Sequence, residues 1–241
     1  MGKGVNMTPR LRTLHVGAPA RILFISDLHL RRQSPEMTQK TLSVCKNTRP
    51  DIVILGGDMA EYDEGLVSAL DAFAEAFKGA KLFAVPGNND DELFEGDRAR
   101  QKQIYRERGV DYLLNEVRRI SVGEAQIEIA GCEDAYSHTP APNGLFSYEK
   151  GVYRVLVCHE PLKCLEGHGS NLLLSGHTHG GQINILGVTC YTLLPYEKRL
   201  KYICLAGKHI KNGCVTLVSR GIGYSKFPVR IGADSEILLI E

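Results

Sequence analysis

The sequence predicts an α/β fold: a two-layered β-sandwich flanked by helices, with a parallel βαβαβ first half and a β-rich second half. Three observations support this prediction. Short apolar runs alternate with helical patterns as far as about residue 109. Beyond residue 113, strand patterns follow one another with little helix between them. Each of the first three apolar runs ends in a group of polar residues or glycines, which is unsuited to a core.

The first half alternates strand and helix signals. Continuous apolar runs without polar alternation are typical of parallel strands that are buried on both faces. The expected strands are 21–26, 51–55 and 81–85. The expected helices are 38–47, 65–77 and 91–108. The short connections between these elements imply a parallel sheet with right-handed crossovers.

The second half is richer in strands. Residues 117–122 and 126–130 flank a short turn at Gly123-Glu124-Ala125 and are typical of an antiparallel hairpin. Further strands are expected at 153–158, 171–175, 202–205, 214–218 and 236–240. Because we find no internal repeat, low-complexity tract or linker, a single domain spanning residues 1–241 is the simplest prediction.

Composition excludes several classes of protein. The 241 residues carry 29 Lys and Arg against 28 Asp and Glu, a net charge of +1, so the basic field of duplex-binding proteins is lacking. No run of about 18 apolar residues predicts a transmembrane segment. Seven cysteines without a CxxC pair argue against a disulfide framework. The start also lacks the apolar core of a secretory signal, so a reducing cytoplasm is expected. The oligomeric state stays open.

Polar residues follow the first three predicted strands. Asp27 and His29 come after the first strand, Asp58 after the second and Asn88 after the third. Ligands of α/β proteins bind at the carboxyl edge of the sheet, where these strands end. A carboxylate and an imidazole two residues apart in an extended segment point to one side and can bind a divalent ion. Each short motif alone is common in turns, but three successive strand ends together predict a site.

Histidines follow two later strands. His159 ends one of them, and a lone histidine there is more commonly a hydrogen-bonded core residue than a ligand. His177 and His179 lie two residues apart in the glycine-rich turn 175–182. Glycines let the backbone approach an ion and aim both rings, so this pair is a metal-ligand candidate.

In combination these motifs resemble the calcineurin-like metallophosphoesterase superfamily. The ordered set, which spans about residues 22–179, is Asp27-x-His29, Gly57-Asp58, Gly87-Asn88-x-Asp90, His159 and Gly176-His177-x-His179. Ser175-Gly176-His177-Thr178-His179-Gly180-Gly181-Gln182 is similar to the YkuE-type bacterial branch. So is the tail, with Gly221-Ile222-Gly223 followed by Pro228-Val229-Arg230.

The resemblance implies a two-metal site. Asp27, His29 and His179 would hold one ion, and Asp58 would bridge to the second. Asn88, His159 and His177 would complete the coordination of that second ion. Nitrogen and oxygen ligands without thiolate suit Mn²⁺ first, with Fe, Zn²⁺ and Co²⁺ as alternatives. Such a pair of ions would share a hydroxide for in-line attack on phosphorus, while the ions and Asn88 stabilise the developing charge.

Three residues are predicted to contact the substrate, namely Asn89, Arg31 and His138. Arg31 has the alternative of a solvated loop. Asn89 departs from the family, most of whose members carry a histidine that contacts the phosphate or protonates the leaving oxygen. An amide donates a hydrogen bond but cannot titrate. Another group then protonates the leaving oxygen, or the substrate has a good leaving group, or turnover is slow.

The function expected from this resemblance is a phosphodiesterase or a nucleotide-type pyrophosphatase that acts on a small phosphoester. Two alternatives stay open. The chain is a weak or inactive metal-binding scaffold, for which Asn89 is the only argument. Otherwise it is a membrane-surface hydrolase of lipid-linked pyrophosphates, for which the apolar stretch 186–194 is the feature to check. The sequence leaves the natural substrate and the acceptance of monoesters open.

Overall fold

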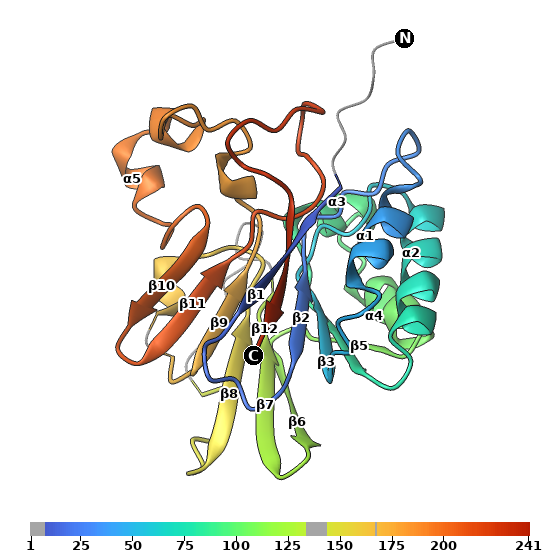
Figure 1. The fold of residues 1–241 in the computed structure, drawn as a ribbon, viewed down its shortest axis with the longest axis vertical. Coiled ribbons are helices and arrows are strands. Elements are labelled where there is room, and N and C mark those ends of the chain that lie inside the picture. The colour runs from blue at the N-terminus through green and yellow to red at the C-terminus, as the bar shows by residue number, and fades with distance from the viewer. Residues whose placement is uncertain (1–7, 134–143, 167) are drawn as a thin grey trace.

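The computed structural model describes residues 8–133, 144–166 and 168–241. Two six-stranded sheets pack against each other, and helices cover the outer face of the first sheet (Figure 1). The predicted α/β sandwich is therefore confirmed, although its helices are few. Among the described residues, no helix combines the length and apolar character needed to cross a membrane.

The first sheet contains the three strands expected in the first half. Its strands, in spatial order, are β1 (Arg10–Leu14), β12 (Glu236–Ile240), β2 (Ile22–Ile25), β3 (Ile52–Leu55), β4 (Lys81–Ala84) and β5 (Val110–Tyr112). Strands β2 to β5 are mutually parallel, and β12 runs antiparallel to β2. The sequence did not predict β1, which is polar, or β5, which has three residues.

Both faces of this sheet are buried, which explains the continuous apolar runs. Leu23 and Ile25 face the helices, whereas Ile22 and Phe24 belong to the core between the two sheets. Alternate side chains of a strand point to opposite faces, so a strand in the middle layer needs apolar residues at every position.

The helices follow the predictions in two cases out of three. Helices α1 (Met37–Cys45) and α2 (Asp63–Ala76) were expected. The single helix predicted over 91–108 is wrong, because α3 (Asn88–Leu93) and α4 (Arg98–Arg106) replace it. Between them, Glu95 and Gly96 have positive φ angles of 52° and 78°. Asp97 then caps α4 by accepting a hydrogen bond from the Arg100 amide at 2.9 Å.

The second sheet contains the expected hairpin and most of the expected strands. Its spatial order is β10 (Gly207–Lys211), β11 (Cys214–Val218), β9 (Leu172–Ser175), β8 (Val152–Val157), β7 (Ala125–Gly131) and β6 (Glu116–Val122). The short helical segments are η1 (Lys163–Leu165), η2 (His179–Gly181), η3 (Tyr191–Leu193) and α5 (Tyr196–Arg199).

The strand predicted at 202–205 is wrong, and β10 takes its place in the sheet. The β-pairing of Tyr202 is an isolated bridge to Leu162. The Ile203 amide donates to Pro161 O, and Leu205 O accepts from the Thr178 hydroxyl. This apolar segment therefore bonds to loops near the strand ends instead of to a neighbouring strand.

Candidate metal centre

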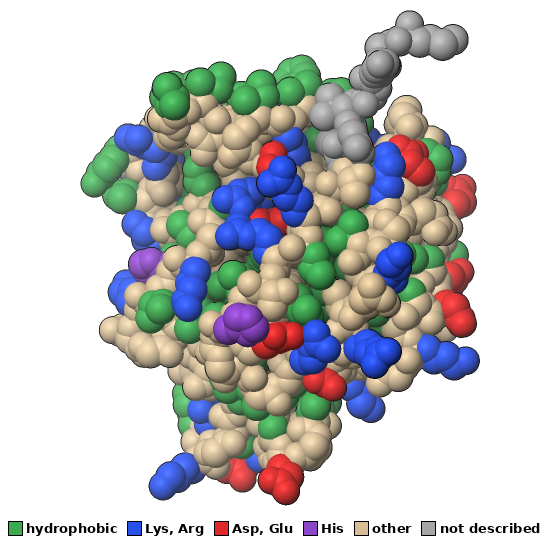
Figure 2. All heavy atoms as spheres, in the orientation of Figure 1, with side chains coloured by type: hydrophobic (Ala, Val, Ile, Leu, Met, Phe, Trp, Pro, Cys, Tyr) green, Lys and Arg blue, Asp and Glu red, His purple; other side chains and the backbone are tan. Residues whose placement is uncertain are grey.

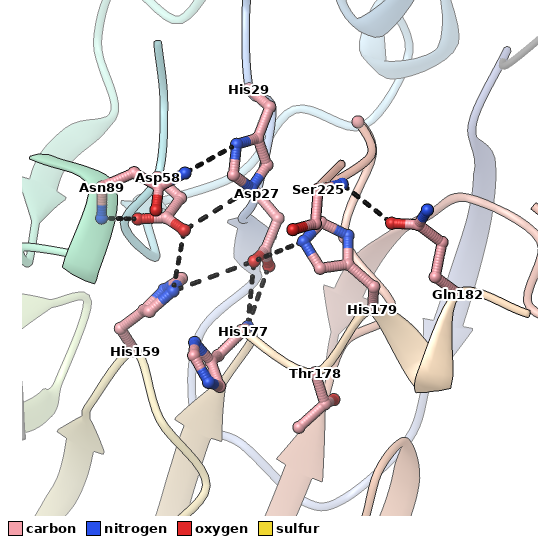
Figure 3. A network of polar contacts seen from close by, with 12 residues as sticks. Asp27, His29, Asp58, Asn89, His159, His177, Thr178, His179, Gln182 and Ser225 are labelled. Atoms are coloured by element: carbon pink, nitrogen blue, oxygen red, sulfur yellow. Dashed lines mark hydrogen bonds and ion pairs between the residues drawn. The ribbon is translucent and has the colours of Figure 1, made fainter. Parts of the chain in front are cut away.

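The polar residues predicted at the strand ends converge at one edge of the two sheets (Figure 3). Asp27 and His29 follow β2, Asp58 follows β3 and His159 follows β8. His177 and His179 follow β9. The site therefore combines loops from both sheets.

Left-handed backbone conformations aim these side chains. Asp27, His29 and Asp58 have φ angles of 52°, 42° and 54°, and His177 and His179 have 67° and 51°. Non-glycine residues rarely adopt positive φ, and such positions concentrate at functional sites. Backbone hydrogen bonds hold the loops after β2 and β3 together. They run from the Asp27 amide to Gly57 O and from the His29 amide to Asp58 O, both at 3.0 Å.

Two overlapping clusters of buried side chains can hold metal ions. Asp27, His29 and His179 form the first cluster, and Asp27, Asp58 and His159 form the second. Within each cluster the ligand atoms lie within 4.8 Å of one another. His179 Nε2 lies 3.6 Å from Asp27 Oδ1. Asp58 Oδ2 lies 3.5 Å from His29 Nε2 and 3.3 Å from His159 Nε2.

The buried imidazole nitrogens fit a metal ion. His29 Nε2 and His159 Nε2 are buried without a hydrogen-bond partner among the described residues. The other nitrogen of His159, Nδ1, donates to Gly56 O at 2.7 Å, which fixes the ring so that Nε2 faces Asp58. Ligands about 2.1 Å from a common ion lie roughly 3–3.4 Å apart, close to the two distances from Asp58 Oδ2.

Electrostatics also favours cation binding. Burial lowers the pKa of His177 to about 3, and burial likewise holds the pKa of His179 well below its usual range. Both rings are therefore neutral at neutral pH, the form that binds metals. Burial alone would raise the pKa of the Asp58 carboxyl, but the adjacent His159 outweighs it and the pKa is lowered. Burial alone would lower the pKa of His159, but the adjacent Asp58 outweighs it and raises that pKa well above its usual range. Asp58 is thus a buried carboxylate beside a cationic partner, a place that a metal cation can take.

Asn88, Asn89 and His177 line a cavity of about 640 Å³ together with His29, Asp58 and His179. Asn88 Oδ1 lies 2.9 Å from His177 Nδ1. The backbone N–H of Asn89 donates to Asp58 Oδ1 at 2.9 Å, and the side-chain Nδ2 of Asn89 lies 3.3 Å from His29 Nδ1. The structure therefore places both asparagines beside the cluster.

Arg31, which was predicted to contact the substrate, is directed elsewhere. Its guanidinium forms two hydrogen bonds to Glu61, one of them at 2.7 Å, and donates to Ser225 O. The guanidinium carbon also lies 4.2 Å from the centre of the Tyr224 ring. Arg31 is not among the residues that line the cavity. His138 lies outside the described residues.

Glu61 is a site residue that the sequence reasoning missed. Its Oε1 lies 3.1 Å from His29 Nδ1, on the side of the ring opposite Asp58. A carboxylate in this position fixes the orientation and tautomer of a metal-binding histidine. The sequence offered one signal, the position of Glu61 three residues after Asp58. In the structure, the bridge between Leu30 and Ala60 continues the pairing of the loops that follow β2 and β3.

The aromatic wall of the cavity was also missed. Tyr202 stacks on His177 with ring centres 6.0 Å apart, and Tyr191 meets Tyr202 edge-on at 5.5 Å. Tyr191 lines the cavity. Both tyrosines lie between η2 and β10: no pattern marks Tyr191, and the sequence placed Tyr202 in a strand that does not form.

Two glycines enclose the Asp27 carboxylate. A Cβ atom at Gly176 would lie 2.3 Å from Asp27 Oδ2, and one at Gly221 would lie 2.5 Å from Asp27 Cβ. The amides of Ile222 and Gly223 donate to Asp27 O at 3.2 and 2.7 Å. The glycines in the turn 175–182 and in the tail motif thus serve the close packing around Asp27.

A two-sheet sandwich with an Asp/His cluster at its strand ends is an arrangement that can hold metal ions. The chain belongs to the calcineurin-like phosphoesterase family, whose model matches residues 20–181. Members of this family hydrolyse phosphoester bonds with divalent metals, and the chain is accordingly a phosphoester hydrolase. The resemblance to this family in the sequence is confirmed.

Relatives extend the similarity over most of the chain. YpbG of Bacillus subtilis is 32% identical over 231 residues, which cover 92% of this chain and 80% of that protein. The phosphodiesterase YaeI of Escherichia coli is 27% identical over 93% of this chain and 82% of its own. A hypothetical protein from Thermus thermophilus shares the fold, with a TM-score of 0.50, 17% identity and coverage of 86% and 78% of the two chains.

Proposed function

We propose that the protein is a dinuclear-metal phosphohydrolase that cleaves phosphodiesters or nucleotide-type pyrophosphates. The observation that carries the proposal is the position of Asp58 Oδ2, between His29 Nε2 at 3.5 Å and His159 Nε2 at 3.3 Å. One carboxylate oxygen between imidazoles of two clusters suits a bridging ligand. The similarity to the phosphodiesterase YaeI supports the diester class.

The proposed ligands divide between two ions. Asp27, His29 and His179 hold one ion, Asp58 bridges, and Asn88, His159 and His177 hold the other. Mn²⁺ is the proposed metal, with Fe, Zn²⁺ and Co²⁺ as alternatives, since the donors are imidazole, carboxylate and amide. When bound, two such ions lower the pKa of a coordinated water and polarise phosphoryl oxygens.

The asparagines orient the phosphoryl group and restrict the leaving group. Asn88 and Asn89 line the cavity beside Asp58, so their amides can hydrogen-bond phosphoryl oxygens. Asn89 stands where most of the family has a titrating histidine, and an amide cannot deliver a proton. The proposed substrates therefore have leaving groups that depart without protonation, such as aryl oxides and phosphoanhydride oxygens.

The direct test is hydrolysis of bis-p-nitrophenyl phosphate by the Mn²⁺-loaded protein and by its Asp58→Asn variant. Loss of an outer partner of a metal ligand costs about 10–100-fold, so loss of the bridging charge should cost more than about 100-fold. Asp63→Asn, at the exposed start of α2, is the matched control and should leave the rate unchanged. Failure of the loaded protein to hydrolyse any diester or pyrophosphate would overturn the proposal.

Two finer assignments accompany this function. The turn 175–182 and the tail at 221–223 support membership of the YkuE-type branch. The free cysteines without a CxxC pair support a cytoplasmic location. A protein that binds Mn²⁺ but is inert towards a broad phosphoester panel would instead favour the scaffold alternative.

A second candidate is hydrolysis of lipid-linked pyrophosphates at a membrane surface. It is favoured by the exposure of Leu186, Val188 and Leu193, which lie in the apolar stretch 186–194 close to the cavity. Hydrolysis of a lipid pyrophosphate in mixed micelles, with no hydrolysis of the matching water-soluble nucleotide pyrophosphate, would select this candidate.

A further inference from the structure

Exposed apolar side chains gather around the mouth of the metal-site cavity. Nine of the eleven large apolar side chains that are exposed among the described residues belong to two segments, 183–200 and 227–231. We call these nine residues the apolar rim: Ile183, Ile185, Leu186, Val188, Leu193, Tyr196, Leu200, Phe227 and Ile231. Figure 2 shows hydrophobic side chains along the end of the molecule that carries α5.

The two segments are held together next to the site. The Asn184 amide donates to Ile231 O at 2.7 Å, and Gln182 Nε2 donates to Phe227 O at 3.0 Å. Ile183 and Phe227 also line the cavity that contains the metal cluster. The apolar rim is therefore one surface, built around the entrance to the site.

Leu186 lies at the tip of a tight turn, a position at which the turn does not require a leucine. Ile185 and Val188 exchange two backbone hydrogen bonds, of 3.0 and 2.9 Å, around a tight turn. Leu186 and Gly187 at its tip have φ angles of 52° and 89°, for which Asn or Gly is the usual first residue. The Leu186 side chain is nevertheless fully exposed, at 101%. A bulky apolar residue that strains its turn and stays in solvent indicates an external partner.

The charges around the apolar rim specify that partner. Residues 183–202 and 224–231 contain five basic residues, Lys198, Arg199, Lys201, Lys226 and Arg230, against one acidic residue, Glu197. Lys198, Arg199, Lys201 and Lys226 are exposed. An isologous contact with a second copy would bring these like charges together. An anionic lipid surface attracts them while its acyl region accepts the apolar side chains.

We infer that the apolar rim docks the protein on an anionic phospholipid bilayer, with the mouth of the metal-site cavity facing the lipid. Leu186, Leu193 and Phe227 enter the boundary between head groups and acyl chains, and the lysines bind lipid phosphates. The cavity then opens towards substrates that reside in the membrane. The link to catalysis rests on the proposed function, whereas docking itself rests only on the exposed surface.

The test is sedimentation of the full chain with vesicles of equal parts phosphatidylglycerol and phosphatidylcholine, compared with pure phosphatidylcholine. We expect binding to the anionic vesicles that weakens as salt screens the lysines. Leu186→Asp combined with Leu193→Asp should lower the partition coefficient about 100-fold, since each buried leucine contributes about tenfold or more. Ile210→Asp, an equally apolar exposed position on the edge strand β10, is the matched control and should change nothing.

Activity is measured separately on bis-p-nitrophenyl phosphate in solution, where the double variant should match the unaltered protein. Binding without diesterase activity would refute the proposed function and leave docking intact. Several results would overturn docking. These are no binding to either vesicle at low salt, an equal loss in Ile210→Asp, or a dimer in solution that Leu186→Asp converts to monomers.

Discussion

At the residue scale, the site depends on side chains held in a backbone conformation that costs free energy. Five of the predicted ligands, Asp27, His29, Asp58, His177 and His179, have φ between 42° and 67°. Each such position costs about 1–3 kcal/mol and persists only where the surroundings enforce it. Here the enforcement comes from hydrogen bonds between loops and from glycines packed on Asp27. The site is therefore preorganised by the fold.

Restoring the family's histidine at position 89 should widen the range of leaving groups. In Asn89→His the new imidazole can protonate a departing oxygen, which contributes about 100-fold or more to the rate. We expect kcat/KM for diesters with alkyl leaving groups to rise by that factor, with little change for bis-p-nitrophenyl phosphate. The pH-rate profile on alkyl diesters should gain a basic limb.

Asn89→Gln is the control for this prediction, because it alters the shape of the site without adding a titratable group. Equal changes for aryl and alkyl diesters in Asn89→His would show that residue 89 does not act on the leaving oxygen.

Removing the charge of Glu61 should weaken metal binding without removing a ligand. Glu61→Gln keeps the size of the side chain but loses the carboxylate that lies 3.1 Å from His29 Nδ1. We expect the affinity for Mn²⁺, measured by calorimetric titration, to fall about 10–100-fold. Glu64→Gln, an exposed residue that pairs with Arg32, should bind Mn²⁺ like the unaltered protein. Unchanged affinity in Glu61→Gln would show that the Glu61 carboxylate does not support metal binding through His29.

At the scale of elements, the loops after the strands and the tail motif form one layer around Asp27. The sequence predicted which strands end in the polar residues that cluster, because apolar runs that stop at polar residues are a local pattern. It did not predict β1 or β5, because a polar strand and a three-residue strand show no periodic pattern. It also did not predict the break between α3 and α4, because Gly96 lies within a charge pattern typical of a helix. Glu61 and Tyr202 gain their roles only from tertiary contacts.

Gly221→Ala tests the contribution of the tail motif to the site. Its Cβ would lie 2.5 Å from Asp27 Cβ, so Asp27 must move and Mn²⁺ affinity should fall at least about tenfold. Gly213→Ala is the matched control, with a similar φ of 80° but open space around the added methyl group. We expect the control to lose about 1 kcal/mol of folding stability and no metal affinity. Equal Mn²⁺ affinities in the two variants would show that an added Cβ at position 221 strains the backbone but does not displace Asp27.

At the scale of the whole molecule, the two sheets share one apolar layer. Phe24 and Ile54 of the first sheet pack in the same cluster as Ile129, Val155 and Leu174 of the second. The division into a parallel half and a strand-rich half was readable from the sequence. The insertion of β12 between β1 and β2 was not, because nothing local specifies which strand a distant segment will pair with.

We therefore expect residues 1–241 to unfold in one cooperative transition, and we expect bound metal to raise its Tm. A ligand at about 100 times its Kd adds about 2.7 kcal/mol, which corresponds to roughly 5–10 °C in Tm for a chain of this size. Differential scanning calorimetry with Mn²⁺ and with chelator measures the shift, and Asp27→Asn should abolish it. Two separate transitions would contradict a single domain, and an unchanged Tm would contradict a metal centre that forms only on folding.

The position of β12 also has a kinetic consequence. Strand β1 pairs with β12 in a register that joins Arg10 to Glu236, and β12 in turn pairs with β2. Contacts between residues so distant in the chain form late, because the entropy of closing the intervening loop must be lost first. The environment of Asp27 is therefore complete only after the last strand and the tail glycines have packed. Refolding should be slow, and competence to bind Mn²⁺ should return with the slowest phase.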